Sequence, residues 1–268
     1  MRLLFIGDIV GSPGVALVRR AVPVLRHAER LDLVVANAEN AANGSGLTPS
    51  QYRQLRAAGV DAVTLGDHVY KKFDIDVVLL NPAEPAVKPA NFPASAPGKD
   101  HAVVTAADGT RVAVISLLGR TFMRPVDCPF AAADRVLASL PPDVKVILVD
   151  IHAEATADKY LMGHHLKGRA SAVLGTHTHV PTADEQILPG GTAFICDVGM
   201  TGPYESVLGR RVDRVLTATM SFVPTSFDVA TGDVRIGGAI VDVDAATGRA
   251  TAIRRVMWKE EEFGERPV

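Results

Sequence analysis

Five short apolar segments of this chain each lead into residues that can bind a metal ion or carry a proton. The segments show no clean alternation of apolar and polar residues, which is typical of strands buried on both faces. In open α/β sheets, ligands bind beyond the carboxyl ends of the strands. We therefore expect the polar residues to meet at one edge of one sheet. The segments are 3–8, 33–40, 62–68, 146–154 and 172–179.

Helical patterns alternate with apolar runs through the first two thirds of the chain, which favours a mainly parallel sheet. Thr48 followed by Pro49 is a typical helix start, with the threonine as N-cap and the proline at the first helical position. The expected strands lie near 3–6, 33–36, 62–65, 112–117, 144–149 and 172–174. The expected helices lie near 14–28, 49–58, 75–80, 131–140 and 157–166.

The final third of the chain has a different pattern, in which turn signals separate β-rich stretches. Segments 234–243 and 251–257 are expected to pair as an antiparallel hairpin. The glycine-rich segment 197–206 is interpreted as an irregular loop. Because no linker or internal repeat interrupts the pattern, we expect residues 1–268 to form one domain.

His177 and His179 are separated by a single threonine at the end of the last apolar segment. In an extended chain, side chains two positions apart share a face, so both rings can point to one place. Neutral imidazole is the commonest metal ligand in proteins. For this pair alone, two polar residues on a solvated strand end remain an alternative.

Each of the other polar groups also has a structural interpretation when it is considered alone. Asp8 could be a turn residue or a helix cap, and His152 could be a satisfied core histidine. Together they form a mixed set of carboxylate, amide and imidazole groups, which suits Mn, Fe or Zn. The set is too large for one tetrahedral site. With Glu39 as a bridge, it could hold two ions about 3.5 to 4 Å apart.

The motifs and their order resemble calcineurin-like metallophosphoesterases, and the longer phrases resemble the bacterial YmdB-like branch. These phrases run from Leu4 to Pro203 in order. The short motifs are Gly7-Asp8, Glu39-Asn40, Gly66-Asp67-His68, His152 and Gly175-Thr-His-Thr-His179.

This resemblance implies an α/β/β/α sandwich, with a mainly parallel sheet and a β-rich, antiparallel C-terminal third. It also implies a di-metal phosphodiesterase in which a metal-bridged hydroxide attacks a small cyclic nucleotide. His68 would be the general acid. One ion would be held by Asp8, Glu39, Asn40 and His179. The other would be held by Glu39, Asp67, His152 and His177.

Two positions depart from the superfamily pattern. The first motif usually contains Asp-x-His, but here it is Asp8-Ile9-Val10, and the branch supplies Asn40 instead. The third motif usually contains Gly-Asn-His, but here Asp67 stands in place of the asparagine. The extra carboxylate is expected to tighten binding of a divalent cation and to reduce its Lewis acidity toward the substrate.

Charge and composition limit the partners of this chain. The formal net charge is −2, with no basic cluster, so we expect no direct binding to nucleic acid or to a membrane surface. No apolar run approaches 18 residues, no leader is recognised, and the two cysteines lie far apart. These features favour a cytoplasmic protein.

Several alternatives stay open at this level. We expect two divalent ions, with Fe or Mn before Zn or Mg, and a small cyclic nucleotide as the substrate. The choice between 2′,3′ and 3′,5′ cyclic nucleotides, the base and the homo-oligomeric state are undetermined. A phosphomonoesterase or protein phosphatase could use the same site. A non-catalytic metal-binding regulator of RNA metabolism is also compatible, because Asp67 departs from the usual motif.

Overall fold

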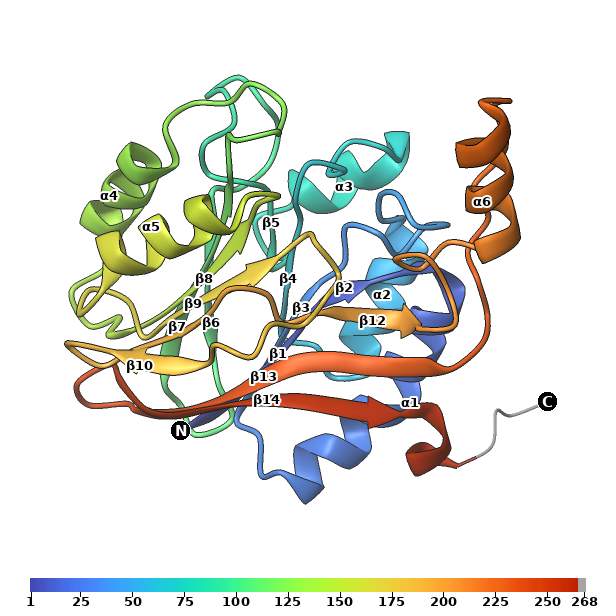
Figure 1. The fold of residues 1–268 in the computed structure, drawn as a ribbon. Helices are drawn as coiled ribbons and strands as arrows, with labels where there is room; N and C mark the ends of the chain where they lie inside the picture. The colour runs from blue at the N-terminus through green and yellow to red at the C-terminus, as the bar shows by residue number, and fades with distance from the viewer. Residues whose placement is uncertain (265–268) are drawn as a thin grey trace.

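The computed structural model describes residues 1–264, which form two β-sheets packed against each other with helices on the outer faces (Figure 1). The larger sheet has eight strands in the order β2-β12-β13-β1-β3-β4-β5, with β14 paired to β13. Its strands are β1 (Arg2–Ile6), β2 (Asp8–Ile9), β3 (Leu33–Asn37), β4 (Ala62–Thr64), β5 (Ala86–Val87), β12 (Met200–Pro203), β13 (Val234–Asp244) and β14 (Arg249–Lys259).

The smaller sheet has six strands in the order β10-β11-β9-β8-β7-β6. The four central strands, β7, β8, β9 and β11, run parallel to one another. The edge strands pair antiparallel, β6 with β7 and β10 with β11. Its strands are β6 (His101–Thr105), β7 (Arg111–Leu118), β8 (Val146–His152), β9 (Ala172–Thr176), β10 (Gln186–Leu188) and β11 (Thr192–Ile195).

Helices lie on both outer faces of the sandwich. The larger sheet packs against α1 (Gly11–Ala28), α2 (Pro49–Ala57) and α3 (Asp76–Leu79), which follows a 3₁₀ turn at Phe73–Ile75. The smaller sheet packs against α4 (Pro129–Ser139) and α5 (Thr156–Leu166). A second 3₁₀ turn covers Glu260–Phe263. The helix α6 (Val212–Ser221) contributes no buried residue.

Successive residues of a central strand enter different hydrophobic cores. In β1, Leu3 and Phe5 face the core between the two sheets, whereas Leu4 and Ile6 face the core under α1 and α2. Because both faces of the strand are covered, every position from Leu3 to Ile6 is apolar and the sequence cannot alternate. The expected α/β/β/α fold is confirmed, and the two-sided burial of its strands explains the unbroken apolar runs.

The fold confirms several local predictions. Thr48 caps α2, and its side chain and that of Gln51 form a reciprocal capping box. The final hairpin is β13 paired antiparallel with β14. No described helix is both long and apolar enough to span a bilayer.

Two predictions are wrong. The polar residues were expected at one edge of one sheet, but they come from the carboxyl ends of strands in two facing sheets. Segment 197–206 was expected to be an irregular loop, but it contains β12, which pairs with β2 and β13. The glycines in this segment suggested a loop; the pairing comes instead from strands that are distant in the sequence.

Candidate metal centre

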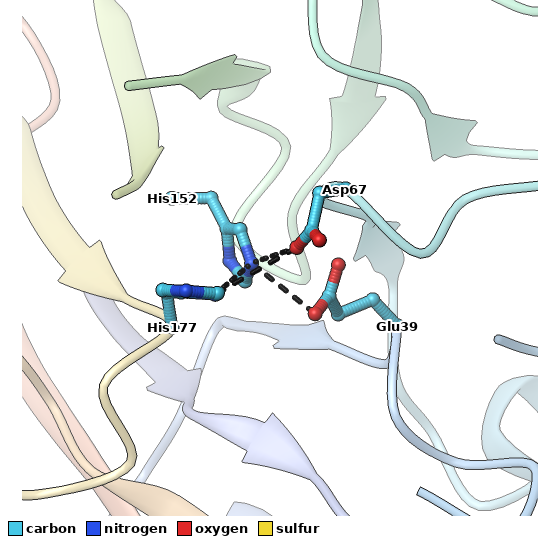
Figure 2. A group of neighbouring side chains, drawn as sticks. All are labelled: Glu39, Asp67, His152 and His177. Carbon is cyan, nitrogen blue, oxygen red and sulfur yellow. Dashed lines mark hydrogen bonds and ion pairs between the residues drawn. The ribbon is translucent and has the colours of Figure 1, made fainter. Parts of the chain in front are cut away.

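Four side chains from the two sheets converge at the carboxyl ends of the strands, as Figure 2 shows. Glu39 and Asp67 follow β3 and β4 of the larger sheet, whereas His152 ends β8 and His177 follows β9 of the smaller sheet. One ligand atom from each residue lies within 4.8 Å of the others. This arrangement brings together the four residues expected to hold the second ion.

The closest approaches in this group involve the His152 ring. His152 Nε2 lies 3.2 Å from Glu39 Oε1 and 3.3 Å from Asp67 Oδ1. His177 Nδ1 lies 3.0 Å from the same His152 nitrogen. A Cβ at Gly66 would come within 2.4 Å of both Glu39 and His152, so only glycine fits before Asp67.

The residues expected to hold the first ion lie on the other side of Glu39. His179 Nε2 is 3.2 Å from Asn40 Nδ2 and 3.8 Å from Asp8 Oδ1. Asn40 Nδ2 also donates to Glu39 Oε1 at 3.2 Å. An amide binds a cation through its oxygen, so Asn40 would have to turn its carbonyl, which now accepts from His68, toward this point.

Asp8 provides the test of whether a cation fits here. Its side chain is fully buried, and Oδ1 has no hydrogen-bond partner. Burial raises the pKa of Asp8 to about 6, although His179 and His152 oppose that shift. A buried carboxylate oxygen without a donor is costly unless a cation pairs with it. The unpartnered oxygen and the surrounding imidazoles therefore suit a divalent ion.

Glu39 and His152 are fully buried, and Glu39 Oε1 lies 3.2 Å from His152 Nε2. Burial disfavours the charged form of Glu39, but the charges of His152 and His68 and their hydrogen bonds outweigh it and hold its pKa well below the usual value. Burial likewise opposes protonation of His152, yet Glu39, Asp67 and Asp8 raise its pKa well above the usual value. A bound cation would replace that proton, since a ligating imidazole is neutral.

Hydrogen bonds on the far side of each ring fix the nitrogen that faces the centre. Thr176 Oγ1 donates to Asp150 Oδ1 at 2.6 Å, so it accepts from His152 Nδ1 at 2.8 Å. The Nε2 atom of His152 therefore faces Glu39. The same arrangement, in which a ligand histidine donates its other N–H to a neighbour, orients rings in known metal sites.

The other two histidines have equivalent partners. His177 Nε2 lies 3.2 Å from Glu154 Oε2, and His179 Nδ1 lies 3.1 Å from the carbonyl oxygen of Leu208. Burial and the charge of His152 lower the pKa of His177 to about 4, so its ring is neutral and able to bind metal. No role was predicted for Glu154 from the sequence, although its position two residues after His152 was a usable signal.

The turn that carries His177 and His179 is strained. Both residues have positive φ angles, 95° and 64°, in a region that costs non-glycine residues about 1 to 3 kcal/mol each. The backbone N–H of His177 donates to Asp8 Oδ2 at 3.0 Å. This bond ties the turn of the smaller sheet to the first motif of the larger one.

A buried ion pair stabilises the turn that carries His177 and His179. Lys159 of α5 and Asp197 are both fully buried, and Lys159 Nζ donates to Asp197 Oδ2 at 2.7 Å. The same carboxylate oxygen accepts from Thr178 Oγ1 at 2.5 Å and from the Thr178 backbone at 3.2 Å. Since Thr178 lies between the two histidines, Asp197 positions both rings.

Replacing Thr178 by valine is expected to weaken divalent metal binding by about tenfold, because supports of metal ligands are typically worth 10- to 100-fold in affinity. Valine keeps the shape of the side chain but cannot donate to Asp197. Thr178→Ser should restore the affinity, and Thr251→Val, in the β14 hairpin, should leave it unchanged. Titration of metal-free protein with Mn²⁺ measures the effect. Wild-type affinity in Thr178→Val would contradict this role.

His68 lies at the edge of the centre with 28% of its side chain exposed. Its Nδ1 is 2.8 Å from Asn40 Oδ1 and 3.3 Å from Glu39 Oε1, while its Nε2 is 3.7 Å from Asp67 Oδ2. The hydrogen bond to Glu39 raises the pKa of His68 despite partial burial, and Asp67 acts in the same direction. A partly exposed imidazole that keeps its proton suits a general acid.

A cavity of about 370 Å³ opens over the centre. Its lining includes Glu39, Asn40, His68, His177 and His179 together with apolar side chains. The volume is near the small end of the range for ligand pockets, which is about 300 to 1,000 Å³. The cavity therefore suits a small molecule.

Comparisons with known proteins agree with this geometry. A family model described as YmdB-like protein matches residues 4–256. A Bacillus subtilis protein named 2′,3′-cyclic-nucleotide 2′-phosphodiesterase is 44% identical over 261 residues, covering 97% of this chain and 98% of the relative.

Two solved structures are similar over nearly the whole chain. A hypothetical protein from Thermus thermophilus has a TM-score of 0.90 and 43% identity, with 97% of this chain and 99% of that chain covered. A structure described as a novel phosphatase from Mycoplasma pneumoniae has a TM-score of 0.89 and 29% identity, with 97% and 93% covered. These similarities extend beyond the short motifs to the order and arrangement of the elements.

Proposed function

The chain belongs to the YmdB-like family, and from this premise we propose that it is a metal-dependent phosphodiesterase that hydrolyses small cyclic nucleotides. The observation that carries the proposal is the convergence of carboxylates and imidazoles from two sheets beneath a small cavity. The name of the Bacillus subtilis relative favours 2′,3′-cyclic nucleotides over 3′,5′-cyclic nucleotides.

We propose that two divalent ions, Fe or Mn before Zn or Mg, are the cofactors. One would lie among Asp8, Glu39, Asn40 and His179, and the other among Glu39, Asp67, His152 and His177. Oxygen Oε1 of Glu39 contacts residues of both groups, at 3.2 Å in each case, which supports its role as the shared ligand. When bound, such ions lower the pKa of water toward about 7 and neutralise charge on a phosphoryl group.

The protein side chains would supply the remaining steps. His68 lies beside the centre but is not needed as a ligand, and its raised pKa keeps a proton available. It would donate that proton to the ribose oxygen that leaves phosphorus. Asp67 would hold His68 in its charged form before transfer, since its Oδ2 lies 3.7 Å from His68 Nε2. The asparagine found in most of the superfamily lacks this charge.

Steady-state hydrolysis of 2′,3′-cyclic AMP by Mn²⁺-loaded protein tests the proposal, beside a chelated control and 3′,5′-cyclic AMP. We expect turnover with Mn²⁺ and none after chelation, because the ions would activate the attacking water and neutralise charge on the phosphoryl group. The 2′,3′ ring is expected to react faster than the 3′,5′ ring. Absence of turnover on both, with two ions bound per chain, would contradict the proposal and favour a non-catalytic regulator.

A phosphomonoesterase is the second candidate, because the Mycoplasma pneumoniae structure is described as a phosphatase. A monoester carries one more negative charge at neutral pH than a diester, and the centre already contains three carboxylates, from Asp8, Glu39 and Asp67. Comparison of kcat/KM for 3′-AMP and 2′,3′-cyclic AMP separates the two functions. Faster turnover of the monoester would favour this second candidate.

A further inference from the structure

Apolar side chains from one segment of the chain, residues 207–227, form part of the lining of the cavity beside the metal-ligand candidates, and we call this part the wall. The segment includes α6 and contributes Val207, Leu208, Val215 and Phe227, together with Arg210. We propose that this wall binds the nucleobase of the substrate, with Phe227 as the stacking residue. The proposal rests on the proposed function, because it assigns a place to the part of a cyclic nucleotide that does not react.

The exposure of these side chains supports the assignment. Phe227 is 45% exposed and Leu208 is 50% exposed, although both line a cavity that also contains metal-ligand candidates. Exposed apolar surface beside a polar centre marks a ligand-binding groove more often than a random surface. A nucleobase has a flat apolar face and would cover both side chains while the cyclic phosphate lies among the metal-ligand candidates of the same cavity.

Hydrogen bonds hold this wall at a fixed distance from the centre. The guanidinium of Arg210 donates to the carbonyl oxygens of Asn43 at 2.9 Å, Gly44 at 2.5 Å and Phe227 at 2.8 Å. It thereby links Phe227 to the loop that follows Glu39 and Asn40. A binding wall held in this way loses little conformational entropy when a ligand stacks on it.

A second link joins the wall directly to a metal-ligand candidate. The carbonyl oxygen of Leu208 accepts from His179 Nδ1 at 3.1 Å, and Leu208 itself has a φ of 51°, which is rare for a branched side chain. With this backbone conformation, the Leu208 side chain lines the cavity while its carbonyl oxygen accepts from the ring of His179. One segment therefore orients His179 and also forms the wall for the base.

The chemistry of the wall predicts how selective it is. Its apolar side chains offer contact surface but no hydrogen-bond donor or acceptor for the edge of a base, and the Arg210 guanidinium beside them already donates to three backbone carbonyls. The polar side chains of the cavity are engaged with one another around the centre. Stacking tolerates any base, because every base has a π face. We therefore infer broad base tolerance, with purines ahead of pyrimidines because of their larger area.

The test compares two substrates that share a five-membered cyclic phosphate but differ in the base. These are 2′,3′-cyclic AMP and glycerol 1,2-cyclic phosphate. Phe227→Ala is expected to raise KM for the nucleotide by about tenfold with kcat unchanged, since loss of one base stack is worth about 1 to 3 kcal/mol. The glycerol substrate should show no change. Phe227→Trp should restore the wild-type KM.

Phe222→Ala is the matched control, because Phe222 is 91% exposed at the end of α6 and does not line the cavity. Equal effects of Phe227→Ala on both substrates would overturn the base wall and leave the proposed function intact. If Phe222→Ala and Phe227→Ala raise KM for the nucleotide equally and both change the sedimentation of the protein, the base wall is also overturned. The surface would then be a contact with a second copy of the chain.

If wild-type protein hydrolyses neither substrate, the proposed function fails and binding alone decides the inference. Calorimetric titration of Mn²⁺-loaded protein with 3′-AMP and with inorganic phosphate is then compared in wild type and Phe227→Ala. Tighter binding of 3′-AMP that depends on Phe227 supports a base wall. Equal binding in the two proteins overturns it.

Discussion

Asp8→Asn is expected to reduce turnover of 2′,3′-cyclic AMP by about 10³-fold and to lower metal content from two ions per chain toward one. Loss of one ion removes several kcal/mol of charge stabilisation, and about 1.4 kcal/mol corresponds to tenfold in rate. Asp8 Oδ1 is buried and has no hydrogen-bond partner, so its charge has no evident structural use. The asparagine carbonyl can still accept from the backbone of His177, which now donates to Asp8 Oδ2.

Elemental analysis after desalting and steady-state kinetics measure both effects. Asp242→Asn is the matched control, because this carboxylate pairs with Arg2 at the opposite end of β1 and β13. Its turnover and metal content should match those of the wild type. Metal-free Asp8→Asn should unfold at a temperature no lower than metal-free wild type, since a buried charge has been removed. Two ions and unchanged turnover in Asp8→Asn would exclude Asp8 as a ligand.

His68→Ala is expected to reduce kcat by about 10² to 10⁴-fold while two ions remain bound, because a positioned general acid typically supplies this factor. The side chain lies beside the centre, and the cluster of Glu39, Asp67, His152 and His177 does not include it. A general acid must be protonated. Wild-type turnover should therefore fall as the pH rises through the raised pKa of His68, and that fall should disappear in the variant.

The leaving group provides the critical control for His68. Bis(4-nitrophenyl) phosphate releases a stable phenolate that needs little protonation, so the defect of His68→Ala should be much smaller on it than on a cyclic nucleotide. His164→Ala, on the exposed face of α5, should change neither substrate. An equal loss on both substrates would show that His68 positions the centre and does not donate a proton.

Much of the fold could be predicted from the sequence because it depends on local properties of the chain. The apolar runs at β1, β3, β4, β8 and β9 were each recognised within a few residues of the observed bounds. Thr48 and Pro49 predict the start of α2 because capping involves only neighbouring residues. No bounds were predicted for β5, β6, β10, β11 and α6, and β12 was misassigned as a loop. β12 is formed by pairing with β2 and β13, and α6 buries no residue.

Part of the candidate site could also be predicted. The structure brings together Asp8, Glu39, Asn40, Asp67, His68, His152, His177 and His179. Their metal and proton-transfer roles stay predictions until the experiments above are done. Two residues that support them were given no role. Glu154 stands at the end of an apolar run, which was a usable signal, whereas Leu208 supports His179 only through a backbone carbonyl, which no local pattern marks.

The sequence by itself determined which segments are buried strands and which residue types end them, because burial on both faces requires unbroken apolar runs. Only the tertiary structure decided that two sheets, facing each other, contribute to one centre. Lys159 illustrates the reason: a lysine in a helix is usually exposed, and it is fully buried here only because Asp197, 38 residues later, pairs with it. Contacts between residues so far apart depend on how the sheets pack, which no local pattern encodes.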